Sequence, residues 1–184
     1  MRSLRHIFIG VVIGIALTLV MQMSISYFLK PIARPVLQDV QFVNYKVSPF
    51  ALEMQLPETT TTTEDYIYGD EVLYNCFLQD ATWQFWGYVQ IWEMSNIDDL
   101  LASSKNQSEW DFVSYDKQDI VIGKHRGFIV SWSAQFRQGQ TVLAEEYFLQ
   151  NNQGNRVLRV TLITDQDEFP DELAETLIAS VRWD

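Results

Sequence analysis

Apolar and polar residues alternate with a two-residue period over much of this chain. Residues 52–57, LEMQLP, follow this pattern and stop at a proline, which predicts a short strand. Further strands are predicted at 71–78 and 82–94; the second has apolar side chains on both faces, which is typical of a central strand covered on both sides by helices. The threonine-rich residues 58–65 are predicted to form a polar loop. Three strand-like runs follow at 127–136, 141–150 and 155–164, joined by glycine-bearing turns that predict hairpins.

Two segments have the apolar spacing of amphipathic helices. In residues 95–105, Ser95 occupies an N-cap position and apolar side chains follow at helical intervals. In residues 169–183, Pro170 lies near the first helical position and acidic residues fill the first turn, where the helix dipole favours them. The order of elements predicts an α+β fold over residues 40–184, with an antiparallel β-sheet flanked by helices.

The N-terminal part of the chain contains a long apolar segment without acidic or basic side chains. Residues 7–29 would span about 34 Å as a helix, against about 30 Å for the hydrocarbon core of a bilayer. We therefore expect a short cytoplasmic N-terminus at 1–6, a transmembrane helix acting as a signal anchor at 7–29, a stalk at 30–39 and an extracytoplasmic domain at 40–184. A signal peptide cleaved after Ser26 is the alternative.

Gly10 and Gly14 lie four residues apart in this apolar segment. The G-x-x-x-G spacing lets two membrane helices approach closely, so a homodimer through this face is a hypothesis. Glycine is also common in membrane helices that do not associate in this way.

Charge and cysteine content exclude several classes of function. Residues 31–184 hold 24 acidic and ten basic side chains, a balance of −14, which argues against binding to nucleic acid phosphates. The single cysteine, Cys76, permits no intramolecular disulfide and no zinc site of several cysteines. The acidic run 165–172 lacks the glycine and the spacing of an EF-hand loop, so we interpret it as a solvated helix entrance. No metal or cofactor is expected.

A cationic turn is the first candidate site. Lys124, His125 and Arg126 stand between two glycines, so the segment can form a tight turn whose cations and backbone N–H groups would bind an anion. The simpler interpretation is an exposed turn that leads into a strand. A hydrolase that uses His125 is the least favoured hypothesis, because the serines of that strand, Ser131 and Ser133, lack the nucleophile-elbow pattern.

Tryptophan provides the second group of candidates. Trp86 and Trp110 are the best placed for exposure to solvent, where an aromatic face is a candidate ligand or glycan platform. The other four tryptophans fall on predicted strands or at a strand-like terminus and are assigned to the core.

Five segments together resemble the PsbP and DcrB-like superfamily: LEMQLP, YVQIWEMSNIDDLLAS, DIVIGKHRGFIVSWSAQF, AEEYFLQNNQGNRVLRVTLIT and DELAETLIASVRW. The resemblance covers roughly residues 45–184 and implies an α/β/α sandwich around an antiparallel sheet. Because members of this superfamily are mostly non-catalytic accessory subunits and envelope lipoproteins, it also implies binding rather than catalysis. Bacterial relatives carry a lipidated cysteine, in place of which this chain has the predicted transmembrane anchor.

We therefore expect a non-catalytic, membrane-anchored extracytoplasmic binding domain, acting as an accessory or assembly factor for an envelope protein complex. This function requires an exposed apolar or acidic patch for a protein partner. The alternative is a ligand sensor or a cell-wall glycan-binding domain, which requires a site lined by Trp86 or Trp110 on which polar groups converge.

Overall fold

The computed structural model describes residues 37–65, 71–94, 96–98, 101, 111–135 and 139–183. Residues Pro35–Asp184 form one compact unit, to which all described residues belong. The predicted transmembrane helix at 7–29, with Gly10 and Gly14, lies outside the described residues, and so does Trp110. Among the described residues, no helix has the length and apolar character needed to cross a membrane.

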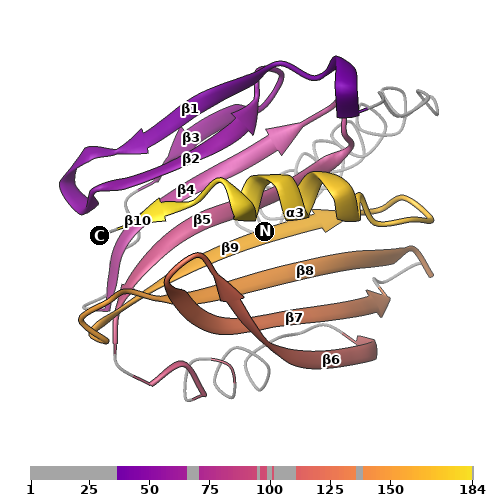
Figure 1. Ribbon diagram of the computed structural model, residues 1–184. Coiled ribbons are helices and arrows are strands. Elements are labelled where there is room, and N and C mark those ends of the chain that lie inside the picture. The colour runs from indigo at the N-terminus through magenta and orange to yellow at the C-terminus, as the bar shows by residue number, and fades with distance from the viewer. Residues whose placement is uncertain are drawn as a thin grey trace, which may run out of the picture. The chain divides into compact units, whose positions relative to one another are not determined.

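A seven-stranded antiparallel sheet forms the main layer (Figure 1). Its strands lie in the order β3 (Thr61–Glu64), β4 (Val72–Asp80), β5 (Phe85–Glu93), β9 (Arg156–Thr164), β8 (Thr141–Gln150), β7 (His125–Gln135) and β6 (Asp111–Ile122). The predicted meander is confirmed, because β7, β8 and β9 pair with their neighbours in sequence order. The threonine-rich loop prediction was wrong in part, since residues 61–64 pair with β4 as an edge strand.

A second, three-stranded antiparallel sheet consists of β1 (Phe42–Val47), β2 (Leu52–Pro57) and β10 (Arg182–Trp183), with β2 in the middle. Two short 3-10 turns, η1 (Leu37–Asp39) and η2 (Ser48–Phe50), precede β1 and connect it to β2. The alternation predicted for 52–57 is confirmed, because Leu52, Met54 and Leu56 are all buried.

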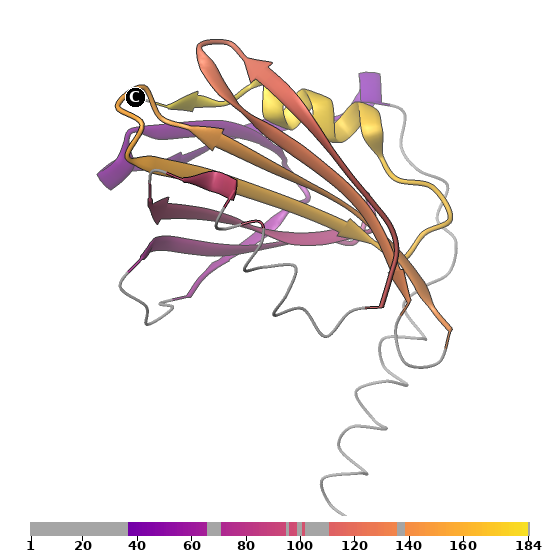
Figure 2. The same cartoon turned by 90° about the horizontal axis from the view of Figure 1, so that it is seen from below.

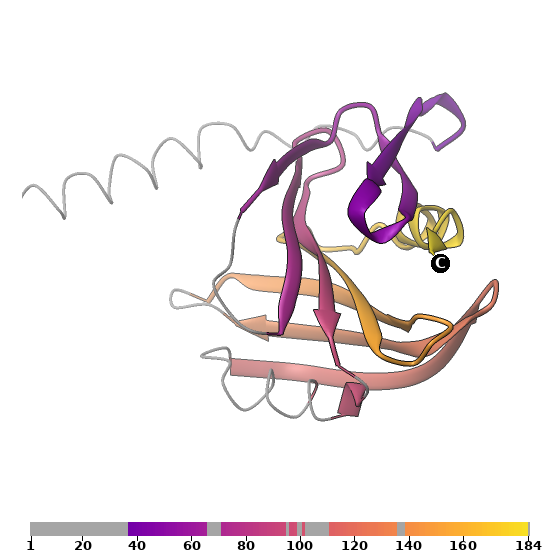
Figure 3. The ribbon, with the colours of Figure 1, turned by 90° about the vertical axis from the view of Figure 1, so that its left-hand side faces the viewer.

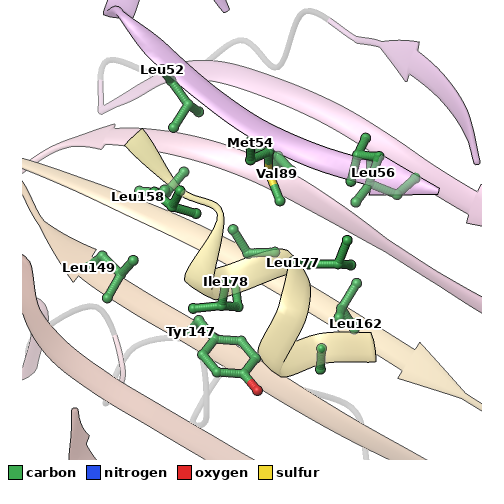
Figure 4. Close-up of a cluster of buried hydrophobic side chains, with 14 of the residues drawn as sticks. Leu52, Met54, Leu56, Val89, Tyr147, Leu149, Leu158, Leu162, Leu177 and Ile178 are labelled. Atoms are coloured by element: carbon green, nitrogen blue, oxygen red, sulfur yellow. The ribbon is translucent and has the colours of Figure 1, made fainter. Parts of the chain in front are cut away.

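The helix α3 (Asp171–Ala179) packs on the same face of the seven-stranded sheet as β1 and β2, on the inside of the bend of that sheet (Figure 3). Its buried residues include Leu173, Leu177 and Ile178, the predicted apolar stripe. They meet side chains from β2 and from β5, β8 and β9 in one core cluster (Figure 4). We call this covered side the inner face and the opposite side the outer face.

The predicted α/β/α arrangement, an α+β sheet flanked by helices, is wrong. The described residues form two antiparallel sheets, and α3 is the one helix that they contain over its whole length. A nine-residue helix is about 14 Å long, whereas seven strands span about 29 Å, so α3 covers only part of the inner face. The small sheet supplies the remaining apolar cover through β2 and Trp183 of β10.

A second hydrophobic cluster lies on the outer face. Val130, Trp132 and Phe148 from β7 and β8 pack there with Ile97 and Leu101. Residues 97, 98 and 101 are helical, as predicted for 95–105, while the other residues of that segment, Asn96 apart, lie outside the described residues. The sheet is therefore covered unevenly on its outer face, and part of β4 and β5 keeps exposed aromatic side chains.

Candidate functional site

The turn between β6 and β7 has the tight geometry expected from its glycines. Ile122 pairs with His125, and Gly123 adopts the left-handed conformation with φ 58°. Lys124 is exposed at the tip. Figure 2 shows this hairpin tip beside β10, at one end of the seven-stranded sheet.

His125 is buried, with 3% of its surface exposed, so the prediction of an exposed turn was wrong for this residue. Its Nδ1 lies 3.2 Å from the carbonyl oxygen of Gln150 and donates to it in the tautomer that protonates Nδ1. Its ring packs against Trp183, with 6.0 Å between ring centroids. Both contacts hold the hairpin against neighbouring strands, which is a structural role.

The two serines of β7 do not meet His125. Ser131 is six residues further along an extended strand, about 20 Å away at 3.3 Å per residue. Its hydroxyl donates weakly to Glu145 Oε1 at 3.4 Å, while Ser133 shares a 2.6 Å hydrogen bond with the hydroxyl of Ser114. The arrangement of histidine and serine that the hydrolase hypothesis requires is not formed by these residues.

Arg126 points to the outer face, because successive side chains of a strand alternate and His125 points inward. It lines a cavity of about 380 Å³ between the β6–β7 hairpin and residues 96–98. The cavity also contains Asp119 and Asp98, and the Asp98 carboxylate accepts a 2.5 Å hydrogen bond from Lys117 Nζ. The three predicted residues of the cationic turn therefore do not converge on one anion site.

A buried ion pair lies between the aromatic residues of the outer face. The guanidinium of Arg159 donates to Glu146 Oε2 through Nε at 2.8 Å and through a second nitrogen, and Trp132 Nε1 donates to Glu146 Oε1 at 2.7 Å. Arg159 also lies over the ring of Tyr88, 4.9 Å from its centroid. Burial raises the pKa of the Tyr88 hydroxyl, and the positive charge of Arg159 opposes part of that increase. Because each charged group has a partner, removal of either one alone would leave a buried unpaired charge, and the pair offers no free charge to a ligand.

Trp86 is exposed, as predicted, at 36% of its surface, and a second aromatic residue lies beside it. Phe77 of β4 is 46% exposed and pairs with Tyr88, while Trp86 pairs with Gln79. Both aromatic side chains therefore lie on the outer face as diagonal neighbours. We define the aromatic platform as this pair together with the polar residues around it on the same face: Thr61, Thr63, Asn75, Phe77, Gln79 and Trp86.

Phe77 was missed in the sequence, although a signal for it exists. On β4 the buried residues Cys76 and Leu78 alternate with Asn75, Phe77 and Gln79. An aromatic residue placed between two amides on one strand face indicates a face that is not fully covered.

Comparison with known proteins provides a fold and no family. No protein-family description matches the sequence. No curated protein matches it either. The solution structure of cyanobacterial PsbP (CyanoP) from Synechocystis sp. PCC 6803 matches with a TM-score of 0.55 and 11% sequence identity, covering 84% of this chain and 99% of that one. The domain has a PsbP-like fold. At this identity the match shows the fold alone.

Acidic residues do not gather into a metal centre within the described ranges, where no three His, Cys, Asp or Glu side chains come together as ligands. The run 165–172 leads into α3, with Asp171 and Glu172 in its first turn, as the sequence predicted. These carboxylates lie where the helix dipole favours negative charge.

Proposed function

We propose that this chain is a non-catalytic, membrane-anchored extracytoplasmic domain that acts as an accessory factor for an envelope protein complex. The membrane part of the proposal rests on the apolar residues 7–29 of the sequence. The PsbP-like fold is consistent with a binding role, because the superfamily that the sequence resembles is mostly non-catalytic. The surface that best supports a protein partner is the edge strand β6.

β6 is a long strand whose outer edge is paired with no other strand of the described residues. None of its twelve residues is buried, and it ends the order of the seven-stranded sheet with β7 as its partner strand in the described part of the chain. Val113 and Val121, at opposite ends of the strand, are 64% and 66% exposed, more than any other large apolar side chain described. An edge strand of this kind offers its backbone N–H and C=O groups to an added strand.

The charges of β6 select between partners. Asp111, Asp116 and Asp119 are exposed along the strand, and the one base, Lys117, forms an ion pair with Asp98. A second copy of this chain would bring a strand of the same net negative charge, which opposes self-pairing. We therefore propose that the partner is a different protein that contributes a strand carrying basic side chains.

Chemical crosslinking in intact membranes, followed by mass spectrometry of the co-purified proteins, tests this function. The full-length chain is compared with a variant lacking residues 1–30 and with Asp119→Lys. We expect a reproducible protein partner that is lost with the deletion and depleted by Asp119→Lys, but retained by Asp167→Lys, which reverses an exposed acid outside β6. Recovery of polysaccharide alone, or equal recovery of the partner with all variants, would contradict the proposal.

A further inference from the structure

The outer face of β3, β4 and β5 carries an exposed aromatic pair that the protein-partner proposal does not use. In antiparallel strands, diagonal neighbours on one face are about 7 to 8 Å apart, within reach of aromatic side chains, so Phe77 and Trp86 are near neighbours on this face. Among the other tryptophans of the described residues, Trp83, Trp132 and Trp183 are buried and Trp92 is half-buried. Two exposed aromatic side chains in contact range on a sheet face indicate a ligand surface.

Uncharged hydrogen-bonding groups surround this pair. Thr63 pairs with Phe77 in the sheet register, and Thr61 pairs with Gln79, which itself lies opposite Trp86. Thr61, Thr63 and Gln79 are all exposed. Hydroxyl and amide groups both donate and accept hydrogen bonds, so this part of an acidic domain suits a neutral polar ligand.

Asn75 adds a second, independent observation on the same face. It lies two residues before Phe77 on the same face of β4, opposite Gln90, and only 3% of its surface is exposed. Its Oδ1 accepts a 2.9 Å hydrogen bond from Gln90 Nε2, but its Nδ2 has no partner among the described residues. A buried donor without an acceptor is costly, and a ligand hydroxyl beside Phe77 would satisfy it.

We propose that the aromatic platform binds a neutral sugar chain. A pyranose ring has an apolar C–H face, which packs on Phe77 and Trp86, and hydroxyl groups around its edge, which reach the amides and threonines of the platform. An ionic ligand would find no opposite charge among the six platform residues, since none of them is charged. The site lies on strands other than β6, so sugar binding can be tested separately from binding of the protein partner.

Saturation-transfer NMR on the full-length chain in phospholipid nanodiscs tests this site, because nanodiscs avoid sugar-based detergents that would compete. Maltotetraose, cellotetraose and chitotetraose are the probes, and they separate α-glucan, β-glucan and N-acetylglucosamine chains as sources. We expect saturation of the ring C–H protons of at least one probe. Absence of transfer to all three probes at about 1 mM, the range of weak single-site binding, would overturn the proposal.

Variants of the platform decide where the sugar binds. Trp86→Ala and Phe77→Ala are each expected to weaken binding about tenfold, whereas Trp86→Phe retains a stacking face and most of the affinity. Asn75→Asp, which keeps the side-chain shape and removes the Nδ2 donor, is expected to weaken it several-fold. Val43→Ala, which changes an exposed apolar residue of β1 outside both proposed sites, serves as the matched control, and thermal melts check that every variant folds. Binding to Trp86→Ala as tight as to the unmodified chain would overturn the assignment.

Discussion

The imidazole ring of His125 packs against the indole ring of Trp183, with 6.0 Å between the ring centroids. His125 is the first residue of β7 in the large sheet, and Trp183 is the last residue of β10 in the small sheet. The contact therefore joins the two sheets at the C-terminal end of the domain. A histidine between two cations, which in the sequence indicated a binding turn, is here part of the packing between sheets.

Replacement of His125 by alanine should destabilise the fold. The change removes a buried ring and its hydrogen bond to the Gln150 carbonyl, and we expect a loss of about 2 kcal/mol in the free energy of unfolding. Lys124→Ala, at the exposed neighbour, should change it by less than about 0.5 kcal/mol. Urea unfolding measures both. Equal midpoints for His125→Ala and the unmodified chain would show that His125 is not structural.

Substitution by alanine should destabilise the fold more at Gly127 than at Gly123, the two glycines around this turn. At Gly127 an added Cβ would lie 1.7 Å from the carbonyl oxygen of Phe148, so the strands must move apart, at a cost of about 3 kcal/mol or more. At Gly123 the space is open and only the left-handed φ of 58° resists alanine, at a cost of about 1 kcal/mol. Thermal unfolding of the two variants compares these costs, and a larger loss at Gly123 would contradict the close strand approach.

Sequence patterns predicted the elements that carry a local signal, and they failed where tertiary pairing decides. β2 and α3 were predicted because their buried residues recur at the period of the element, and β7 to β9 because glycine-bearing turns separate three strand-like runs. β1 shows no such alternation: only Val47 of its six residues is buried, and the strand exists because it pairs with β2. The threonines of β3 are all exposed and are extended for the same reason, through β4.

Removal of one partner of the buried ion pair should lower the free energy of unfolding more than removal of both. Glu146 and Arg159 side chains are 12% and 11% exposed, so Glu146→Ala leaves a nearly buried guanidinium without its carboxylate, and we expect a loss of about 3 kcal/mol. The double variant Glu146→Leu with Arg159→Met removes both charges and should recover most of that loss. Denaturant unfolding of the single and double variants tests the coupling; additive losses would contradict it.

Glu145, the neighbour of Glu146, points to the inner side and should make stability depend on pH. Burial raises its pKa above the usual range, the hydrogen bond from Tyr147 opposes the increase, and nearby Asp171 adds to it. Because the folded-state pKa lies above the unfolded-state value, ionisation of Glu145 destabilises the fold as pH rises through both values.

Glu145→Gln should therefore unfold at a higher temperature than the unmodified chain at pH 7, because an amide carries no charge to desolvate. The difference should close below about pH 4, where the carboxyl is protonated in both folded and unfolded states. Glu58→Gln, at an exposed position, is the control. A difference in melting temperature that persists unchanged at pH 3.5 to 4 would rule out ionisation as its cause.

The candidate sites were only partly accessible from the sequence. Exposure of Trp86 was predicted, but Phe77 and Asn75 became visible as its neighbours only through the register of β4 and β5. The cationic turn failed as a site because strand alternation sends His125 inward and Arg126 outward, a consequence of where β7 begins. A shift of one residue in that strand would have exchanged their roles.

Site-specific photo-crosslinking from the edge of β6 is the most direct test of the proposed function. A photoreactive residue is placed at Val113 or Val121 of the full-length chain in its native membrane, with Val43 of β1, 46% exposed, as the matched control. We expect a crosslinked protein of one defined mass from both β6 positions and none from Val43. No adduct from β6, or the same adducts from all three positions, would contradict a protein partner at this edge.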